Sequence, residues 1–223
     1  MIVFDPDHLF PLLDPGSHTY SEAQNHSAQV DSHLGFHFQN IEENLLKNHR
    51  YKSDHEAVQP WVGLPVQAMQ TPYTEIRYIL SLLNPQPGQS IVDLGCAYGR
   101  MGHVVGHHYP AVHFTGYELV KERVEEGLKT LKPFAYANVR LETCDLSRPE
   151  FAPPQANTYF IFDFGSASAI EKTLQDLRII AQNQAITVVA RGRGIRHQIY
   201  QSHPWLHQMK DPQNFGHFTL FRS

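Results

Sequence analysis

Residues 73–202 alternate between short β-branched runs and amphipathic helical repeats, and this alternation restricts the fold more than any other feature of the chain. Strands are expected at 90–95, 112–118, 138–145, 157–165 and 184–192. Helices are expected at 74–83, 100–108, 120–131, 168–180 and 195–201. Alternation at this spacing is typical of an α/β fold, in which helices cover both faces of a doubly wound parallel sheet.

Two further apolar runs end the chain. Residues 205–210 and 215–223 predict two more strands, and the turn DPQNFG joins them. Strands joined by a short turn pair in opposite directions. We therefore expect a terminal hairpin added to the edge of the parallel sheet.

The first 70 residues differ from the remainder in charge and in pattern. Residues 1–60 carry nine acidic and three basic residues, a net charge of −6. The remainder carries 13 acidic and 15 basic residues, a net charge of +2. One helix is expected there, from Gln39 to Asn48, and the rest is expected to be extended or loop. The chain is therefore divided into an N-terminal extension at 1–70, acting as a lid or a substrate platform, and a domain at 71–223.

The composition argues against several classes of protein. A formal net charge of −4 gives no overall attraction to nucleic acid or to an anionic membrane. The two cysteines, Cys96 and Cys144, have no metal-like or disulfide-like spacing, so we expect reduced thiols in a cytoplasmic protein. The opening residues lack the basic region of a secretory signal, and no apolar run reaches the length of a membrane span.

A glycine turn follows the first expected strand in the sequence IVDLGCAYGR. Its glycines, Gly95, Gly99 and Gly102, have the spacing GxxxGxxG, which differs from the GxGxxG pattern of dinucleotide sites. An acid, Asp93, stands two residues before the first glycine, where it repels a phosphate and suits a cationic amine. The turn also lacks the GK[ST] of a phosphate-binding loop.

Acidic residues also end the next three expected strands, at the edge of the sheet where ligands bind in this class of fold. Glu118 lies 23 residues after Gly95, a distance typical of an acid that accepts both ribose hydroxyls. Asp145 can accept a hydrogen bond from an adenine amino group, with Leu146 against the ring. Asp163 follows the fourth strand at the switch point of the sheet. It faces a reacting group there, or it caps the next helix by itself or through Ser166.

Residues 71–223 resemble a class I S-adenosylmethionine-dependent methyltransferase in the segments DLGCAYG, GYEL, CDL and DFGS. The resemblance implies a Rossmann-like, mostly parallel seven-stranded sheet with a reversed terminal strand, and S-adenosyl-L-methionine as cofactor. It implies that Asp93 holds the amino end of the cofactor and that Glu118 binds its ribose. The remaining cofactor contacts that it implies are Gly95, Cys96, Ala97, Gly99, Asp145 and Leu146.

The segment TPYTEIRYILSLL, before the first strand, is similar to the non-SET protein lysine methyltransferases built on this fold. By that resemblance Thr71 and Tyr73 contact the methionine end of the cofactor, and Tyr73 and Asp163 flank the methyl group as catalytic residues. The [DN]PP[YFW] motif of adenine and glutamine methyltransferases is absent after the fourth strand. We therefore expect an enzyme that methylates a protein side-chain amine, that of lysine.

Other functions stay open at this point. The acceptor is alternatively a small molecule or RNA, or the protein binds the cofactor without catalysis and acts through a partner. An NAD oxidoreductase is disfavoured by the glycine spacing. Arg191, Arg193 and Arg196 follow the fifth strand, where they meet phosphate or an acidic substrate segment, or form a solvated loop.

The fifteen histidines include one pair with a spacing that suits a metal ion. His103 and His107 are four residues apart on an expected helix. No third ligand accompanies them, and the seven histidines of residues 1–60 show no ligand spacing. We expect no metal site and no membrane partner.

Overall fold

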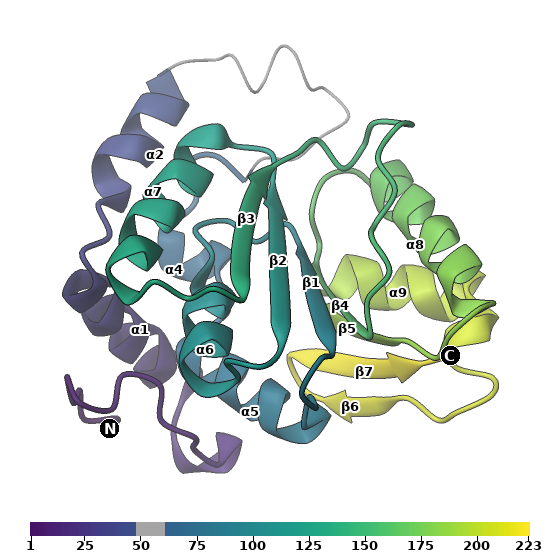
Figure 1. The fold of residues 1–223 in the computed structure, drawn as a ribbon, viewed down its shortest axis with the longest axis horizontal. Coiled ribbons are helices and arrows are strands. Elements are labelled where there is room, and N and C mark those ends of the chain that lie inside the picture. The colour runs from purple at the N-terminus through teal and green to yellow at the C-terminus, as the bar shows by residue number, and fades with distance from the viewer. Residues whose placement is uncertain (48–60) are drawn as a thin grey trace.

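The computed structural model describes residues 1–47 and 61–223, and a seven-stranded sheet forms its centre (Figure 1). The strands are β1 (Ser90–Leu94), β2 (His113–Glu118), β3 (Val139–Thr143), β4 (Thr158–Phe162), β5 (Thr187–Arg191), β6 (Gln213–Phe215) and β7 (Phe218–Arg222). Their order is β3-β2-β1-β4-β5-β7-β6, and β7 runs in the opposite direction to the other strands. The expected α/β fold class, with a reversed terminal strand, is confirmed.

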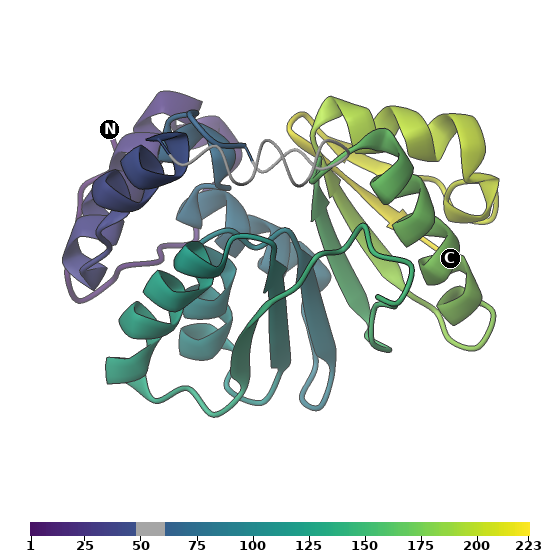
Figure 2. The same ribbon diagram turned by 90° about the horizontal axis from the view of Figure 1, so that it is seen from above.

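Helices cover both faces of the sheet (Figure 2). The helices of one layer are α5 (Tyr73–Leu83), α6 (Arg100–His108) and α7 (Lys121–Leu131), and those of the other are α8 (Ala167–Ala181) and α9 (Arg193–Ser202). Alternate strand residues point to opposite layers, since side chains alternate along a strand. Ile91 belongs to the core cluster that contains Ile76 and Val104, whereas Val92 belongs to the cluster that contains Leu174 and Ile199.

The terminal hairpin is shorter than expected, and its first arm was predicted in the wrong place. Residues 205–210 do not form a strand, because Pro204 begins a 3-10 turn, η3 (Pro204–Leu206). The strand β6 lies instead inside the segment expected to be the turn. The chain reverses at Gly216, whose φ of 67° is left-handed.

The N-terminal part contains more helix than expected, namely η1 (Pro15–Ser17), α1 (Tyr20–Leu34), α2 (Phe38–Lys47) and α4 (Val66–Met69). Helix α2 matches the expected helix at 39–48, and the expected last residue, Asn48, lies outside the described residues. Helix α1 was not predicted, although Thr19 and Glu22 form a capping box at its start. Its buried face includes His26, Ser27 and Asp31, so it lacks the apolar periodicity that identifies a helix.

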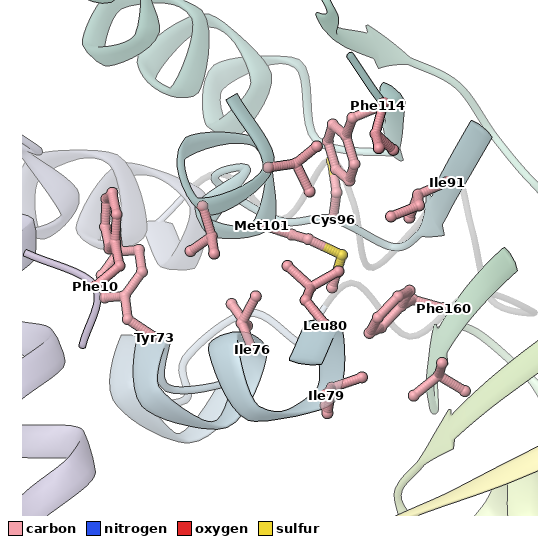
Figure 3. Packing of buried hydrophobic residues seen from close by; sticks show 14 of the residues in the cluster. Phe10, Tyr73, Ile76, Ile79, Leu80, Ile91, Cys96, Met101, Phe114 and Phe160 are labelled. Atoms are coloured by element: carbon pink, nitrogen blue, oxygen red, sulfur yellow. The ribbon is translucent and has the colours of Figure 1, made fainter. Parts of the chain in front are cut away.

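The N-terminal residues pack into the core of the sheet layer beside α5–α7. Phe10 is buried and its ring centroid lies 5.1 Å from that of Tyr73 (Figure 3). Asp31 of α1 forms a buried ion pair with Arg100, the first residue of α6. The first 47 residues therefore contribute core contacts, and the domain boundary after residue 70 stays a prediction.

Candidate functional site

Two adjoining cavities lie at the ends of β1 and β4, on the carboxyl edge of the sheet. The outer cavity has a volume of about 60 Å³ and the inner cavity about 40 Å³. Both are lined by Met69, Gly95, Ala97 and Phe162, so they form one site. Open α/β sheets bind ligands at this edge, next to the switch point at which the strand order reverses.

Most of the residues predicted for the site line these cavities. Those that line the outer cavity are Gly95, Ala97, Glu118, Asp145 and Leu146. Those that line the inner cavity are Thr71, Asp93, Gly95, Cys96 and Ala97. Three predicted residues line neither cavity: Tyr73, Gly99 and Asp163.

The glycine turn is built from backbone in the left-handed region. Gly95, Ala97 and Gly99 have φ values of 96°, 48° and 79°. The amides of Gly95 and Cys96 both donate to the Tyr117 carbonyl oxygen at 2.9 Å, which holds the turn against β2. At Gly99 an added Cβ would lie 2.6 Å from Leu141 Cδ1, so this glycine permits the close approach of α6 to the sheet.

Glu118 ties the turn to the end of β2. Its Oε2 accepts the Ala97 amide at 3.0 Å, and its Oε1 accepts the Val120 amide at 2.9 Å. Burial raises the pKa of Glu118, against the opposing effect of Arg123, whose Nη1 is 3.7 Å from Oε1. Each carboxylate oxygen has a second lone pair, so Glu118 can still accept hydroxyl groups from a ligand in the outer cavity.

Asp93 has a different environment. It lines the inner cavity, and its carboxylate has no hydrogen-bond partner among the described residues. Burial and the charge of Glu118 raise the pKa of Asp93 to about 7. A cationic ligand group in the inner cavity would therefore stabilise the ionised form of this side chain.

Asp145 and Leu146 lie in the loop after β3. Asp145 Oδ1 accepts the Ser147 amide at 3.0 Å and the Ser147 hydroxyl at 2.6 Å, which fixes the loop as an Asx turn. Leu146 is buried, and its side chain forms part of the apolar wall of the outer cavity.

Tyr73 faces the core, away from both cavities. Its side chain is 0% exposed, its hydroxyl donates to Asp31 Oδ1 at 3.0 Å, and the Arg100 guanidinium lies 5.1 Å from its ring centroid. Tyr73 is the first residue of α5 and shares the buried face of that helix with Ile76 and Leu80 (Figure 3). This position does not support the expected contact with the methyl group, whereas Thr71 does line the inner cavity.

Asp163 caps a helix. Its Oδ2 accepts the Gly194 amide at 3.1 Å and its Oδ1 accepts the Ile195 amide at 2.6 Å, at the start of α9. The next helix along the chain, α8, is capped instead by Ser166, which accepts the Ala169 amide at 3.2 Å. The position of Asp163 therefore supports the capping alternative, on a later helix than expected, over the expected catalytic role.

Three polar residues of the inner cavity were not predicted as site residues. Gln70 is 4% exposed, and neither its amide oxygen nor its amide nitrogen has a hydrogen-bond partner within residues 1–47 and 61–223. Arg100 pairs with Asp31, and Arg191 pairs with Glu75 at 3.0 Å. The sequence pointed to the arginines after the fifth strand, but it gave no sign that Arg191 is buried.

His103 and His107, the pair with metal-like spacing, contact other side chains. His103 Nε2 lies 3.0 Å from Thr130 Oγ1, and the His107 ring packs against Phe10 and His108. No group of three side chains able to bind a metal occurs within residues 1–47 and 61–223. Over the same ranges, no helix has the length and apolar character needed to cross a membrane.

No protein-family model matches this sequence, and no curated protein matches it. Solved structures do match. TrmN from Thermus thermophilus is 12% identical, with a TM-score of 0.52 over 69% of this chain and 48% of that one. An RNA methyltransferase from Salinibacter ruber in complex with S-adenosyl-L-homocysteine is 20% identical, with a TM-score of 0.49 over 69% and 91% of the two chains. A TehB-like SAM-dependent methyltransferase from Corynebacterium glutamicum is 14% identical, with a TM-score of 0.48 over 82% and 97%.

These likenesses concern the fold. The chain spans about half of the Thermus thermophilus protein, 48% of its length. The strand order and the reversed β7 are those of the Rossmann-like fold of class I S-adenosylmethionine-dependent methyltransferases. The resemblance expected from the sequence is confirmed at the level of the fold.

Proposed function

We propose that this protein is an S-adenosylmethionine-dependent methyltransferase. The observation that carries the proposal is Asp93, an unpartnered carboxylate in the inner cavity with a pKa raised to about 7. The ammonium group of the cofactor would supply the missing partner, and it would keep Asp93 ionised. A cofactor with a phosphate at this point would meet a repelling charge instead.

The remaining site residues have groups that complement the other parts of this cofactor. We assign the Gln70 amide to the carboxylate of its amino-acid end, because the buried Nε2 has no acceptor in the part of the chain that the structure describes. Glu118 would accept the ribose hydroxyls in the outer cavity. Asp145 would accept the adenine amino group, and Leu146 would pack against the ring.

Bound S-adenosylmethionine supplies a methyl group on a sulfonium centre, which a nucleophile displaces in line. The contribution of this chain is to position the two reactants and to exclude water, and positioning can supply about 7–11 kcal/mol. Met69 and Phe162 border both cavities and provide apolar walls where these meet. We assign no general base, because Asp163 binds the amides of α9. A lysine ammonium group would lose its proton to solvent before the neutral amine attacks the methyl group.

For the acceptor we propose the side-chain amine of a protein lysine. The segment after β4, DFGS, lacks the motif with which adenine and glutamine methyltransferases hold an amide. Trp61, Phe162 and Phe164 present aromatic surface to the outer cavity, which suits an aliphatic stem that ends in an ammonium group. Arg191 does not oppose such a cation with a free charge, since Glu75 neutralises it.

Calorimetric titration tests the cofactor. S-Adenosylmethionine should bind the wild-type protein, and NAD, as the control, should not. Asp93→Asn should weaken binding about 10- to 100-fold, because the negative charge that pairs with the ammonium group is lost, although the amide oxygen can still accept a hydrogen bond. Absence of S-adenosylmethionine binding by the wild-type protein would contradict the proposal.

A labelled-methyl screen then tests the acceptor, with protein, RNA and small-molecule fractions offered separately. Label in protein that survives hydrolysis as methyl-lysine supports the lysine proposal. Label found only in RNA or in small molecules would overturn it and leave the cofactor assignment intact. Cofactor binding with no labelled acceptor would favour the alternative, a catalytically silent protein that acts through a partner.

A further inference from the structure

A third cavity lies beyond Arg191, between the N-terminal segment, α5 and the terminal hairpin, which meet at one edge in Figure 1. We call it the hairpin cavity, and its volume is about 330 Å³. Side chains that line it include Asp14, Tyr20, Glu75, Tyr78, Phe215 and Phe218. Phe218 pairs in register with Arg191 on β5, so the cavity opens next to the carboxyl end of β5.

A thin partition separates the hairpin cavity from the inner cavity. Arg191 lines the inner cavity, whereas Tyr20 and Glu75 line the hairpin cavity. Arg191 Nε donates to Glu75 Oε1 at 3.0 Å, and its Nη2 donates to the Tyr20 hydroxyl at 2.8 Å. A ligand in the hairpin cavity would therefore lie one side-chain layer away from the proposed site of methyl transfer.

The lining of the hairpin cavity is aromatic. Phe215 and Phe218 stack with centroids 4.9 Å apart, and Tyr78 meets Phe215 edge-on at 6.1 Å. The Tyr20 and His217 rings, which also line it, lie 4.8 Å apart. Aromatic faces attract an organic cation and also pack against an aliphatic stem.

Charge adds to this preference. The Asp14 carboxylate lines the cavity, and no lysine or arginine is found among the described residues that line it. Glu75 also lines it, but its charge is paired with that of Arg191. A cationic side chain in the cavity would be attracted to the Asp14 carboxylate.

An unpartnered polar group also points to a ligand. Thr74 is 1% exposed and lines the cavity, and its hydroxyl oxygen has no hydrogen-bond partner among the described residues. A buried polar group without a partner costs free energy. An ammonium group in the cavity would donate a hydrogen bond to it.

We propose that the hairpin cavity binds a lysine side chain of a basic polypeptide. The proposal rests on the proposed function only in treating that polypeptide as the methyl acceptor, because binding in the cavity requires no cofactor. The bound lysine would anchor the polypeptide beside the methyl-transfer site.

The test is calorimetric titration of the full chain, without cofactor, with a short oligolysine peptide. The same peptide with every lysine Nζ acetylated is the ligand control and should not bind. Tyr78→Leu should weaken oligolysine binding about fivefold through loss of an aromatic face. Asp14→Asn should weaken it about threefold, since one carboxylate charge at the cavity is lost.

Asp211→Asn is the matched control, because it removes the same charge from an exposed position that does not line the cavity. Affinity unchanged by Asp211→Asn but reduced by the two cavity variants supports the proposal. Equal effects of Asp14→Asn and Asp211→Asn would show only general charge attraction and would overturn it. Tighter binding of an oligouridine than of oligolysine would also overturn it.

Thermal unfolding checks that each variant is folded, and Phe215→Leu replaces Tyr78→Leu if that variant is not. Oligolysine binding tests this inference, and S-adenosylmethionine binding tests the proposed function. Loss of S-adenosylmethionine binding with retained oligolysine binding contradicts the proposed function alone. Retained S-adenosylmethionine binding without oligolysine binding contradicts this inference alone.

Discussion

Asp93 makes the proposed cofactor site sensitive to pH. In the free protein its pKa is raised to about 7, so the carboxyl group is protonated below that pH. An ammonium group binds the ionised form, and a proton must then be released on binding. We expect the affinity for S-adenosylmethionine to fall about tenfold per pH unit below pH 7, and to be level just above it, until the ammonium group of the ligand itself loses its proton. Calorimetry from about pH 5.5 to about pH 7.5 measures this slope.

The matched variant for this pH dependence is Asp93→Asn, which cannot titrate. Its affinity should be weaker than that of the wild-type protein and level across the same pH range. If the affinity of the wild-type protein for S-adenosylmethionine did not change with pH, Asp93 would not bind the charged end of the cofactor.

Gln70 provides a second prediction at the residue scale, specific to one end of the cofactor. Gln70→Leu should weaken S-adenosylmethionine binding about tenfold, because the hydrogen bond from its amide is lost. It should leave the binding of methylthioadenosine, which lacks the amino-acid end, unchanged. Competition calorimetry with the two ligands measures the difference. The control, Gln182→Leu, alters an exposed residue at the end of α8 and should affect neither ligand. Equal losses for both ligands would contradict the assignment.

The placement of single residues was predictable where it depends on local backbone. Asp93 lies near the end of β1, and Gly95 and Ala97 follow that strand directly, so the local backbone brings them to the cavities. The orientation of Tyr73 depends on Asp31 of α1, and that of Asp163 on α9, which begins 30 residues later. The sequence around Tyr73 and Asp163 does not identify such distant partners.

Among the elements, α9 provides a prediction that separates capping from catalysis. Asp163→Ala removes the acceptor for two amides at its start and should lower the free energy of unfolding by about 0.5–2 kcal/mol. Asp163→Asn should retain most of the stability, because asparagine also caps helices. Urea unfolding measures both variants. Wild-type methyl transfer by Asp163→Asn supports a capping role, whereas loss of transfer in a stable variant would restore the catalytic one.

Elements were predictable where periodicity was strong. Helix α6 begins and ends where the sequence placed it, because apolar residues recur at helical spacing between Gly99 and Tyr109. Helix α1 was missed because its buried face is partly polar. The strand β6 has three residues and exists only by pairing with β7, so its own composition could not identify it.

At the scale of the whole molecule, the contacts of α1 bear on the boundary predicted after residue 70. Asp31 forms a buried ion pair with Arg100, accepts the Tyr73 hydroxyl, and accepts a hydrogen bond from Gln67. Removal of one partner from a buried pair leaves an uncompensated charge in a low dielectric. A fragment of residues 71–223 would expose the core surface that Phe10 covers and leave Arg100 unpaired.

We therefore expect the fragment 71–223 not to fold cooperatively, and Asp31→Asn to lower the free energy of unfolding by about 3–5 kcal/mol. Asp7→Asn, at an exposed position, is the control and should change it by less than about 0.5 kcal/mol. Urea unfolding of the variants and circular dichroism of the fragment measure these outcomes. A fragment that unfolds in one cooperative transition near that of the full chain would establish residues 71–223 as an independent domain. If instead the fragment does not fold and Asp31→Asn is destabilised, the N-terminal helices belong to the same folding unit as the glycine turn.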